Sequence, residues 1–329
     1  MKIFNRFHHP ICILAVTCLL PAAATADTDY DRLVVFGDSL SDPGNAFALT
    51  GEQSVPPYGT LDDFLVPSAP YAKGGHHLSN GATWIEQLGK TLKVNKSVGP
   101  AWKVPGVFSN YALDRARARD DGINVNLSDQ IAAFVSTGQP VPQDALVVIW
   151  IGGNDVRDAL GSDDPEAVFL AALTAIGDAI SVLYPLGARH FLVGNVPDLG
   201  LIPSIQLFAQ QFPLPINEAI IQGATDAALA FNVQLVGNAD LGIMGLLPFL
   251  ASVLPGTDFK VLDSFAVIQD VVASPGDFGL FDAENACVTP NVPPFSCRNP
   301  NDFLFWDGVH PTKAGHAILA DTALDVLSH

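Results

Sequence analysis

Basic residues are scarce in this sequence. Its 329 residues include 16 Lys and Arg against 34 Asp and Glu, and the formal net charge at pH 7 is −18. A surface of this sign repels phosphate backbones and anionic lipid headgroups, because both are negatively charged. The composition therefore excludes nucleic acid as a partner and disfavours a strongly anionic membrane.

Uninterrupted apolar runs of the roughly 18 or more residues that span a bilayer are also lacking. The run Ile11–Leu20 is too short to do so, and it follows the basic residues Lys2 and Arg6. A small-x-small site ends at Ala26. This order is typical of a secretory signal peptide, so we predict that residues 1–26 are removed and the protein is secreted, to the periplasm or outside the cell. A retained anchor helix is the less favoured alternative.

The remainder, residues 27–329, shows no internal repeat and no Ser/Gly linker. Its length suits one large α/β domain, and we predict a single domain with no membrane-spanning segment. A second apolar stretch, Leu241–Leu254, is short and contains Pro248. It either covers an apolar site or forms a buried helix, and the second interpretation is favoured.

Cysteine is rare as well. Two of the four cysteines lie in the predicted signal peptide, which leaves Cys287 and Cys297. An even pair in an exported chain favours one disulfide. A metal pair is the alternative, although no Cys or His stands nearby in a usual ligand spacing.

Short β-branched runs alternate with amphipathic stretches along the chain. The predicted strands are Leu33–Phe36, Leu146–Ile151, Phe191–Val193 and Phe259–Leu262. The predicted helices are Trp84–Thr91, Ser128–Val135, Glu166–Tyr184, Asn217–Leu235 and a last one from Pro311 to Leu327. Such alternation indicates right-handed crossovers and a mostly parallel sheet covered on both faces.

The stretch VVFGDSLSDPGN at residues 34–45 ends a predicted strand on Ser39. Ligands of open α/β sheets sit at the carboxyl ends of the strands. Ser39 is therefore either one more turn residue or a nucleophile, and a nucleophilic hydroxyl needs a base.

One of the histidines carries a carboxylate at a suggestive spacing. In FWDGVHPTKAGH, Asp307 precedes His310 by three residues within a glycine-containing turn. A carboxylate at that spacing can reach the ring Nδ1–H and leave Nε2 for the nucleophile. The alternative is that His310 merely begins the final helix beside Pro311.

Acyl transfer also needs donors aimed at an oxyanion. Three candidates stand in turns: the N–H of Ser39, the N–H of Gly81 in SNGATW, and the side-chain amide of Asn154 in GGND. Each is a weak signal alone because Gly-Asn turns are common. No serine has Gly at both −2 and +2, which argues against the nucleophile elbow of α/β-hydrolases.

Together these stretches resemble the SGNH, or GDSL, hydrolase family. FGDSLSD, SNGATW, GGND and DGVH fall in that family's order and spread over residues 36–310. The resemblance implies a three-layer α/β/α sandwich of flavodoxin-like type and ester hydrolysis without a cofactor or metal. It also implies a catalytic triad of Ser39, Asp307 and His310, and an oxyanion hole of Ser39, Gly81 and Asn154.

The chain departs from the family at Arg115, where glycine is frequent, so the conformation of that turn is in question. Small-molecule or lipid esters are the expected substrates, with a phospholipase or a carbohydrate acetylesterase differing only in the pocket. An acyltransferase using the same triad and a non-catalytic exported binding protein are the alternatives. A metal-dependent phosphoesterase is disfavoured, because His76 and His77 lack clustered carboxylates and more simply occupy a polar loop. Asn95 and Asn126 stand in N-x-S/T sequences.

Overall fold

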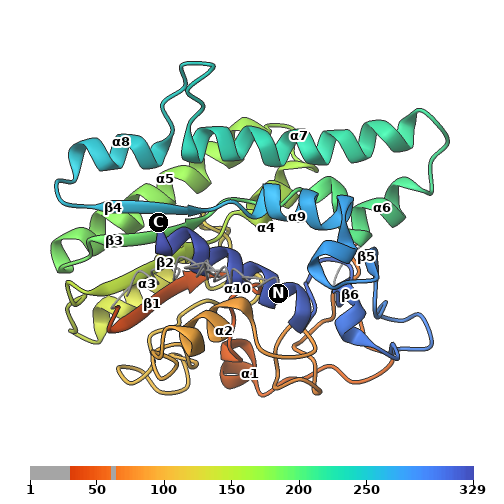
Figure 1. Ribbon diagram of the computed structural model, residues 1–329, viewed down its shortest axis with the longest axis horizontal. Coiled ribbons are helices and arrows are strands. Elements are labelled where there is room, and N and C mark those ends of the chain that lie inside the picture. Colours follow the sequence, from red (N-terminus) through yellow and green to blue (C-terminus); the bar gives the residue numbers. More distant parts are fainter. Residues whose placement is uncertain (1–29, 61–63) are drawn as a thin grey trace, which may run out of the picture.

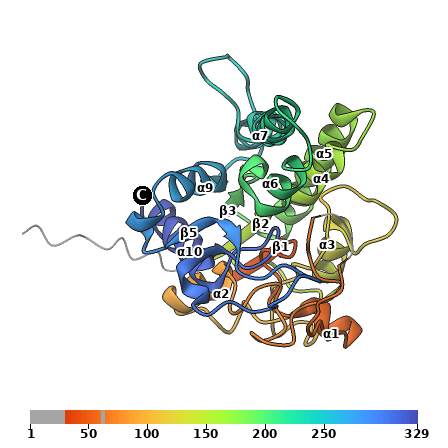
Figure 2. The same cartoon turned by 90° about the vertical axis from the view of Figure 1, so that its right-hand side faces the viewer.

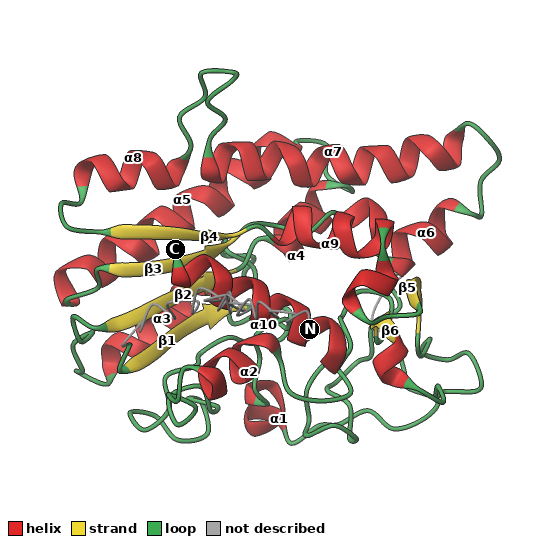
Figure 3. Cartoon of the chain, in the orientation of Figure 1, coloured by secondary structure: helices red, strands yellow, loops and turns green. Residues whose placement is uncertain are grey.

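A computed structural model of the chain describes residues 30–60 and 64–329. The predicted signal peptide, residues 1–26, lies outside the described residues. The chain folds around one sheet with helices on both sides (Figures 1 and 3).

The main sheet is parallel and carries the predicted strands. Its order is β1 (Arg32–Gly37), β2 (Ala145–Trp150), β3 (His190–Gly194) and β4 (Asp258–Leu262). Every residue of β2 is buried, as expected for a β-branched run covered on both faces. All four strand predictions are confirmed.

A fifth extended segment completes the sheet at the outer edge of β1. The N–H of Val35 donates to Ser109 O at 2.8 Å, and the N–H of Tyr111 donates to Val35 O at 2.8 Å. This bridge is parallel, so residues 109–113 occupy the place of a second strand beside the first. The resulting order, 2-1-3-4-5 in chain order, is the flavodoxin-like one.

Helices fill the connections. They are α1 (Asn45–Thr50), α2 (Trp84–Thr91), α3 (Leu127–Ser136), α4 (Gly153–Ala159), α5 (Pro165–Leu183), α6 (Pro203–Ala209), α7 (Ile216–Val236), α8 (Leu246–Val253), α9 (Ser264–Ala273) and α10 (Lys313–Ser328). The five predicted helices correspond to α2, α3, α5, α7 and α10. A second, two-stranded sheet pairs β5 (Asp282–Ala286) with β6 (Phe303–Phe305).

Two apolar cores lie on the two faces of the main sheet, because successive strand side chains point to opposite sides. Phe36 of β1 belongs to the core formed with α3, α5 and α7. Val35 belongs to the core formed with Trp84 of α2 and Leu319 of α10. Figure 2 shows these helices on opposite sides of the strands. The predicted three-layer fold is confirmed.

The apolar stretch at 241–254 supplies α8, which contacts α7, α5 and β4. Leu247 and Leu250 are buried, while Phe249 is 50% exposed, so the helix is half-buried. It lies beside the amino-terminal end of β4, whereas Ser39 follows the carboxyl end of β1 (Figure 1). It therefore does not cover the site described below.

Two helices, Pro165–Leu186 and Ile216–Val236, are long and apolar enough to cross a membrane by length and composition alone. In this fold both lie on one face of the sheet. Phe169 and Ile176 of α5 and Phe231 of α7 are buried in its core.

Candidate active site

Ser39 stands in a tight turn directly after β1. Gly37 ends the strand, and a Cβ added there would lie 2.6 Å from Trp150 O, so only glycine lets β1 and β2 approach this closely. The turn is then held by Asp38, whose Oδ1 accepts the N–H of Leu40 at 3.0 Å. Ser39 is thereby presented at the carboxyl end of the sheet, where sites of such folds lie.

The structure brings Ser39, His310 and Asp307 together, although 271 residues separate the serine from the histidine. His310 Nε2 lies 2.9 Å from Ser39 Oγ, and Nδ1 lies 2.9 Å from both carboxylate oxygens of Asp307. Asp307 Oδ1 also accepts the backbone N–H of His310 at 2.8 Å. The short turn thus orients the imidazole by two contacts from one carboxylate.

Tyr71 is a fourth member of this chain of hydrogen bonds, and the sequence did not reveal it. Its hydroxyl donates to Asp307 Oδ2 at 2.9 Å, and the side chain is 1% exposed. The Tyr71 ring packs edge-on against Tyr58 and Trp306. No local motif marks Tyr71, which is 236 residues from Asp307.

Burial and charge act in opposite directions on the imidazole. Burial disfavours the imidazolium form of His310, but the charge and hydrogen bond of Asp307 outweigh it, so the pKa lies above its ordinary value. Burial also raises the pKa of Asp38 to about 7. The site therefore holds two groups whose pKa values lie above their ordinary values.

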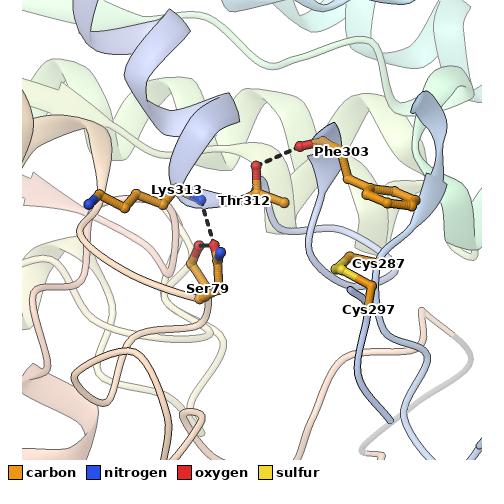
Figure 4. Close-up of a disulfide and its surroundings, with 7 residues drawn as sticks. Ser79, Cys287, Cys297, Phe303, Thr312 and Lys313 are labelled. Atoms are coloured by element: carbon orange, nitrogen blue, oxygen red, sulfur yellow. Dashed lines mark hydrogen bonds between the residues drawn. A yellow bond between two sulfur atoms is a disulfide. The ribbon is translucent and has the colours of Figure 1, made fainter. Parts of the chain in front are cut away.

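Gly81 lies on a loop that is fastened to the start of α10. Ser79 Oγ donates to Pro311 O at 2.8 Å. The Lys313 N–H donates to Asn80 Oδ1 at 2.6 Å, and Figure 4 shows Lys313 beside Ser79 of this loop. A Cβ added to Gly81 would lie 3.0 Å from Lys313 Cδ, so the two residues are in close contact. These bonds couple the glycine loop to the segment that follows His310.

Asn154 is placed by the start of α4, which follows β2. Its Nδ2 donates to Ala116 O at 2.9 Å, and a primary amide keeps a second N–H for another acceptor. The next residue, Asp155, is buried and accepts the N–H of Ala118 at 2.8 Å. The loop 115–119 therefore holds the amide in position.

Arg115 adopts the left-handed conformation with φ of 63°. This is the region that glycine enters without strain, which explains the glycine frequent in the family. Arg115 adopts the same left-handed turn that glycine would adopt. Its guanidinium donates to Ser68 O and approaches Asp114 at 3.4 Å.

Ser39 and Asn154 both line a pocket with mostly apolar walls, among them Trp150, Leu199 and Phe305. The pocket is narrow, with a cavity volume of only about 50 Å³. Gly81 is not among the residues that line this pocket.

Cys287 and Cys297 form a disulfide with Cα atoms 5.3 Å apart, as the sequence predicts. The N–H of Cys287 donates to Phe305 O at 3.0 Å, so the bridged loop lies against β6 (Figure 4). Because β6 leads directly to Asp307, the disulfide supports the segment that carries the carboxylate.

The two predicted loop histidines lie outside the pocket lining. His77 Nε2 is 2.9 Å from Glu86 Oε2, and His76 stacks on Phe47. Within residues 30–60 and 64–329, no three His, Cys, Asp or Glu side chains are grouped as metal ligands. Of the two N-x-S/T asparagines, Asn126 is buried as the N-cap of α3, which leaves its amide inaccessible, and Asn95 is exposed.

Comparison with known proteins places the chain in a family. The profile of the GDSL-like lipase/acylhydrolase family matches residues 33–323. A phosphatidylcholine-sterol acyltransferase of Aeromonas hydrophila is 26% identical over 95% of each chain. A GDSL esterase/lipase of Arabidopsis thaliana is 28% identical over 92% of this chain and 90% of its own.

Solved structures give weaker likenesses. A lipolytic G-D-S-L family protein from Veillonella parvula has a TM-score of 0.44 at 15% identity, covering 90% of this chain and 97% of its own. An acetylxylan esterase from Geobacillus stearothermophilus has a TM-score of 0.43 at 16% identity, covering 90% and 94%. Because the family profile spans nearly all the described residues, the chain belongs to the GDSL-like lipase/acylhydrolase family and is a carboxylic ester hydrolase.

Proposed function

We propose that the protein is an exported serine esterase or lipase that hydrolyses carboxylic esters through an acyl-enzyme. One observation carries the proposal: Ser39 Oγ lies 2.9 Å from His310 Nε2, while Asp307 holds the opposite ring nitrogen. A nucleophile, a base and an orienting carboxylate within hydrogen-bond reach are the parts that acyl transfer requires.

In the first half-reaction, His310 takes the proton of Ser39 as the hydroxyl attacks the ester carbonyl. Negative charge develops on the carbonyl oxygen, and the N–H of Ser39, the N–H of Gly81 and the amide of Asn154 stabilise it. Loss of one such donor typically raises the barrier by roughly 3 kcal/mol. His310 then protonates the leaving alcohol, since the imidazolium formed beside Asp307 can return its proton.

In the second half-reaction, water replaces the alcohol and follows the same path, which releases the acid and restores Ser39. No cofactor enters either step, so residues of this chain supply all the groups. Export after removal of residues 1–26, and a single catalytic domain over residues 27–329, belong to this proposal. The amino-terminal sequence of protein recovered outside the cytoplasm tests the cleavage site.

The decisive variant is Ser39→Ala, assayed with p-nitrophenyl butyrate. Loss of the nucleophile should reduce kcat by about 10³-fold or more while circular dichroism shows an unchanged fold. A fluorophosphonate probe should label the wild type and not the variant. The control Ser41→Ala removes a buried hydroxyl two residues away, which accepts from Trp84 Nε1, and should keep turnover and labelling. Turnover that survives in Ser39→Ala would end the proposal.

Acyl transfer to an alcohol in place of water is the second candidate function. The relative from Aeromonas hydrophila carries the name of an acyltransferase, and the pocket beside Ser39 has mostly apolar walls. An acceptor assay separates the two reactions: a sterol or long-chain alcohol added to the ester substrate should yield a new ester if transfer competes with hydrolysis. Release of free acid alone assigns hydrolysis.

A further inference from the structure

Between α4, α6 and α7, a second cavity adjoins the pocket that Ser39 lines, called the catalytic pocket below. Arg157 lines both cavities, so they share part of one wall. Arg157 stands one helical turn after Asn154 on α4, and its guanidinium lies 4.4 Å from the ring centre of Phe64. The second cavity, called the side pocket below, is also wider. Its cavity volume is about 460 Å³, against about 50 Å³ for the catalytic pocket.

The side pocket has apolar walls in an acidic protein. Its lining includes Phe64, Leu160, Ile205, Phe208 and Ile220. Leu160 is 39% exposed and Phe208 is 37% exposed, so large apolar side chains remain accessible there. The adjoining segment, residues 199–217, contains no Asp, Glu, Lys or Arg, although the chain has 34 acidic residues. An accessible cavity whose lining is apolar apart from Arg157 and Ser204 favours a hydrocarbon ligand.

One polar atom in the lining lacks a partner. Ser204 is 2% exposed, and its Oγ has no hydrogen-bond partner within the described chain. Its backbone N–H donates to Gly308 O at 3.0 Å, which ties the side pocket to the turn between Asp307 and His310. A buried hydroxyl without a partner is unfavourable, and this one belongs to the wall of the side pocket.

We propose that the side pocket binds the hydrocarbon chain of a long-chain ester during turnover at Ser39. The inference rests on the proposed function and names its substrate class. The bound chain is either the acyl chain or the alcohol chain, and substrates that lengthen only one of them distinguish the two.

Gly223 of α7 allows the pocket to be filled without disturbing the fold. It lines the side pocket, and a Cβ added there meets no atom within 4 Å. Gly223→Leu therefore occupies the cavity, and replacing glycine inside a helix favours the helix. The control Gln222→Leu adds the same side chain to the neighbouring exposed position, which is not part of the lining. Ala219→Leu is a second blocking variant on the same helix.

Three substrates are assayed in the same detergent micelles: p-nitrophenyl acetate, p-nitrophenyl palmitate and hexadecyl acetate. In Gly223→Leu and Ala219→Leu, kcat/KM should fall by about tenfold or more for one long-chain substrate and stay within about twofold for p-nitrophenyl acetate. A loss on palmitate assigns the acyl chain to the side pocket, and a loss on hexadecyl acetate assigns the alcohol chain. Gln222→Leu should match the wild type on all three.

The proposal is overturned if both blocking variants keep wild-type kcat/KM on both long-chain esters. It is also overturned if the wild type turns over p-nitrophenyl acetate but neither long ester. Failure of the proposed function looks different, because Ser39→Ala would then retain turnover of p-nitrophenyl acetate.

Discussion

The turn that carries Asp307 and His310, called the catalytic turn below, lies next to the side pocket, but the two regions are built in different ways. Around Asp307 the polar atoms are buried and paired: one carboxylate accepts from Tyr71, from the His310 ring and from the His310 backbone. The side pocket is wide and apolar, and its Ser204 hydroxyl has no partner in the described chain. Directional hydrogen bonds therefore define the first region, whereas the size and apolar walls of a cavity define the second.

This difference agrees with the roles that we propose for the two regions, which are catalysis for the turn and binding of a hydrocarbon chain for the side pocket. A buried charge needs hydrogen bonds in defined directions, so few arrangements of the catalytic turn are stable. A hydrocarbon chain requires only apolar volume, and apolar walls of similar size are interchangeable. We therefore expect substitutions in the catalytic turn to lower kcat equally for all esters, whereas substitutions in the side pocket change the dependence on chain length.

Asp307→Asn should have the largest effect on the catalytic side of this comparison. Without the carboxylate the imidazole loses its orienting partner, and we expect kcat to fall by about 10³- to 10⁴-fold for short and long esters alike. Asp307 is what holds the pKa of His310 above its ordinary value. In the proposed mechanism neutral His310 acts as the base, so activity should fall as pH drops through this pKa, and the acid limb should move to lower pH in the variant.

The measurement is the pH dependence of the residual kcat/KM for p-nitrophenyl acetate and p-nitrophenyl palmitate. A loss restricted to one chain length would break the distinction between the two regions. An acid limb that stays at the wild-type pH would mean that Asp307 does not set the pKa of His310.

Tyr71→Phe should lower kcat less than Asp307→Asn does. It should move the acid limb of the pH profile in the opposite direction. The ring contacts with Tyr58 and Trp306 persist, while Asp307 loses one donor. A hydrogen bond to a charged group is worth roughly 1.5–3 kcal/mol, so kcat should fall by about 10- to 100-fold. With Asp307 less neutralised, the pKa of His310 and the acid limb should rise. A loss of thermal stability with unchanged kcat and pH profile would reduce Tyr71 to a packing residue.

Arg115→Gly should have the smallest effect and should leave both regions unchanged. At φ of 63° a non-glycine residue is strained by roughly 1–2 kcal/mol. Arg115→Ala loses the guanidinium contacts with Ser68 and Asp114 but keeps this strain, so the glycine variant should be the more stable of the two by about 1 kcal/mol in urea unfolding. Both should retain wild-type activity on short and long esters. Equal stability of the two variants would show that the turn is not strained.

Local sequence patterns were enough to predict the strands of the main sheet, the longer helices and the pairing of Asp307 with His310. Runs such as Leu146–Ile151 predict buried strands because alternation with helices leaves both sheet faces covered, and long helices such as α5 carry enough turns to show their period. Asp307 and His310 were paired from their spacing, since three residues within one turn bring the two side chains together. The short helices α1, α4 and α6 escaped prediction, because two turns or fewer show no clear period.

Only the tertiary structure decided the contacts between distant segments. Residues 109–113 include polar Ser109 and Asn110, so nothing local marked them as an extension of the sheet beside β1. Tyr71 reaches Asp307 across 236 residues, and the side pocket exists only where α4, α6 and α7 meet. Sequence periodicity reports which face of an element is buried, whereas the partner of a single polar atom, or the volume between three helices, depends on how the elements pack.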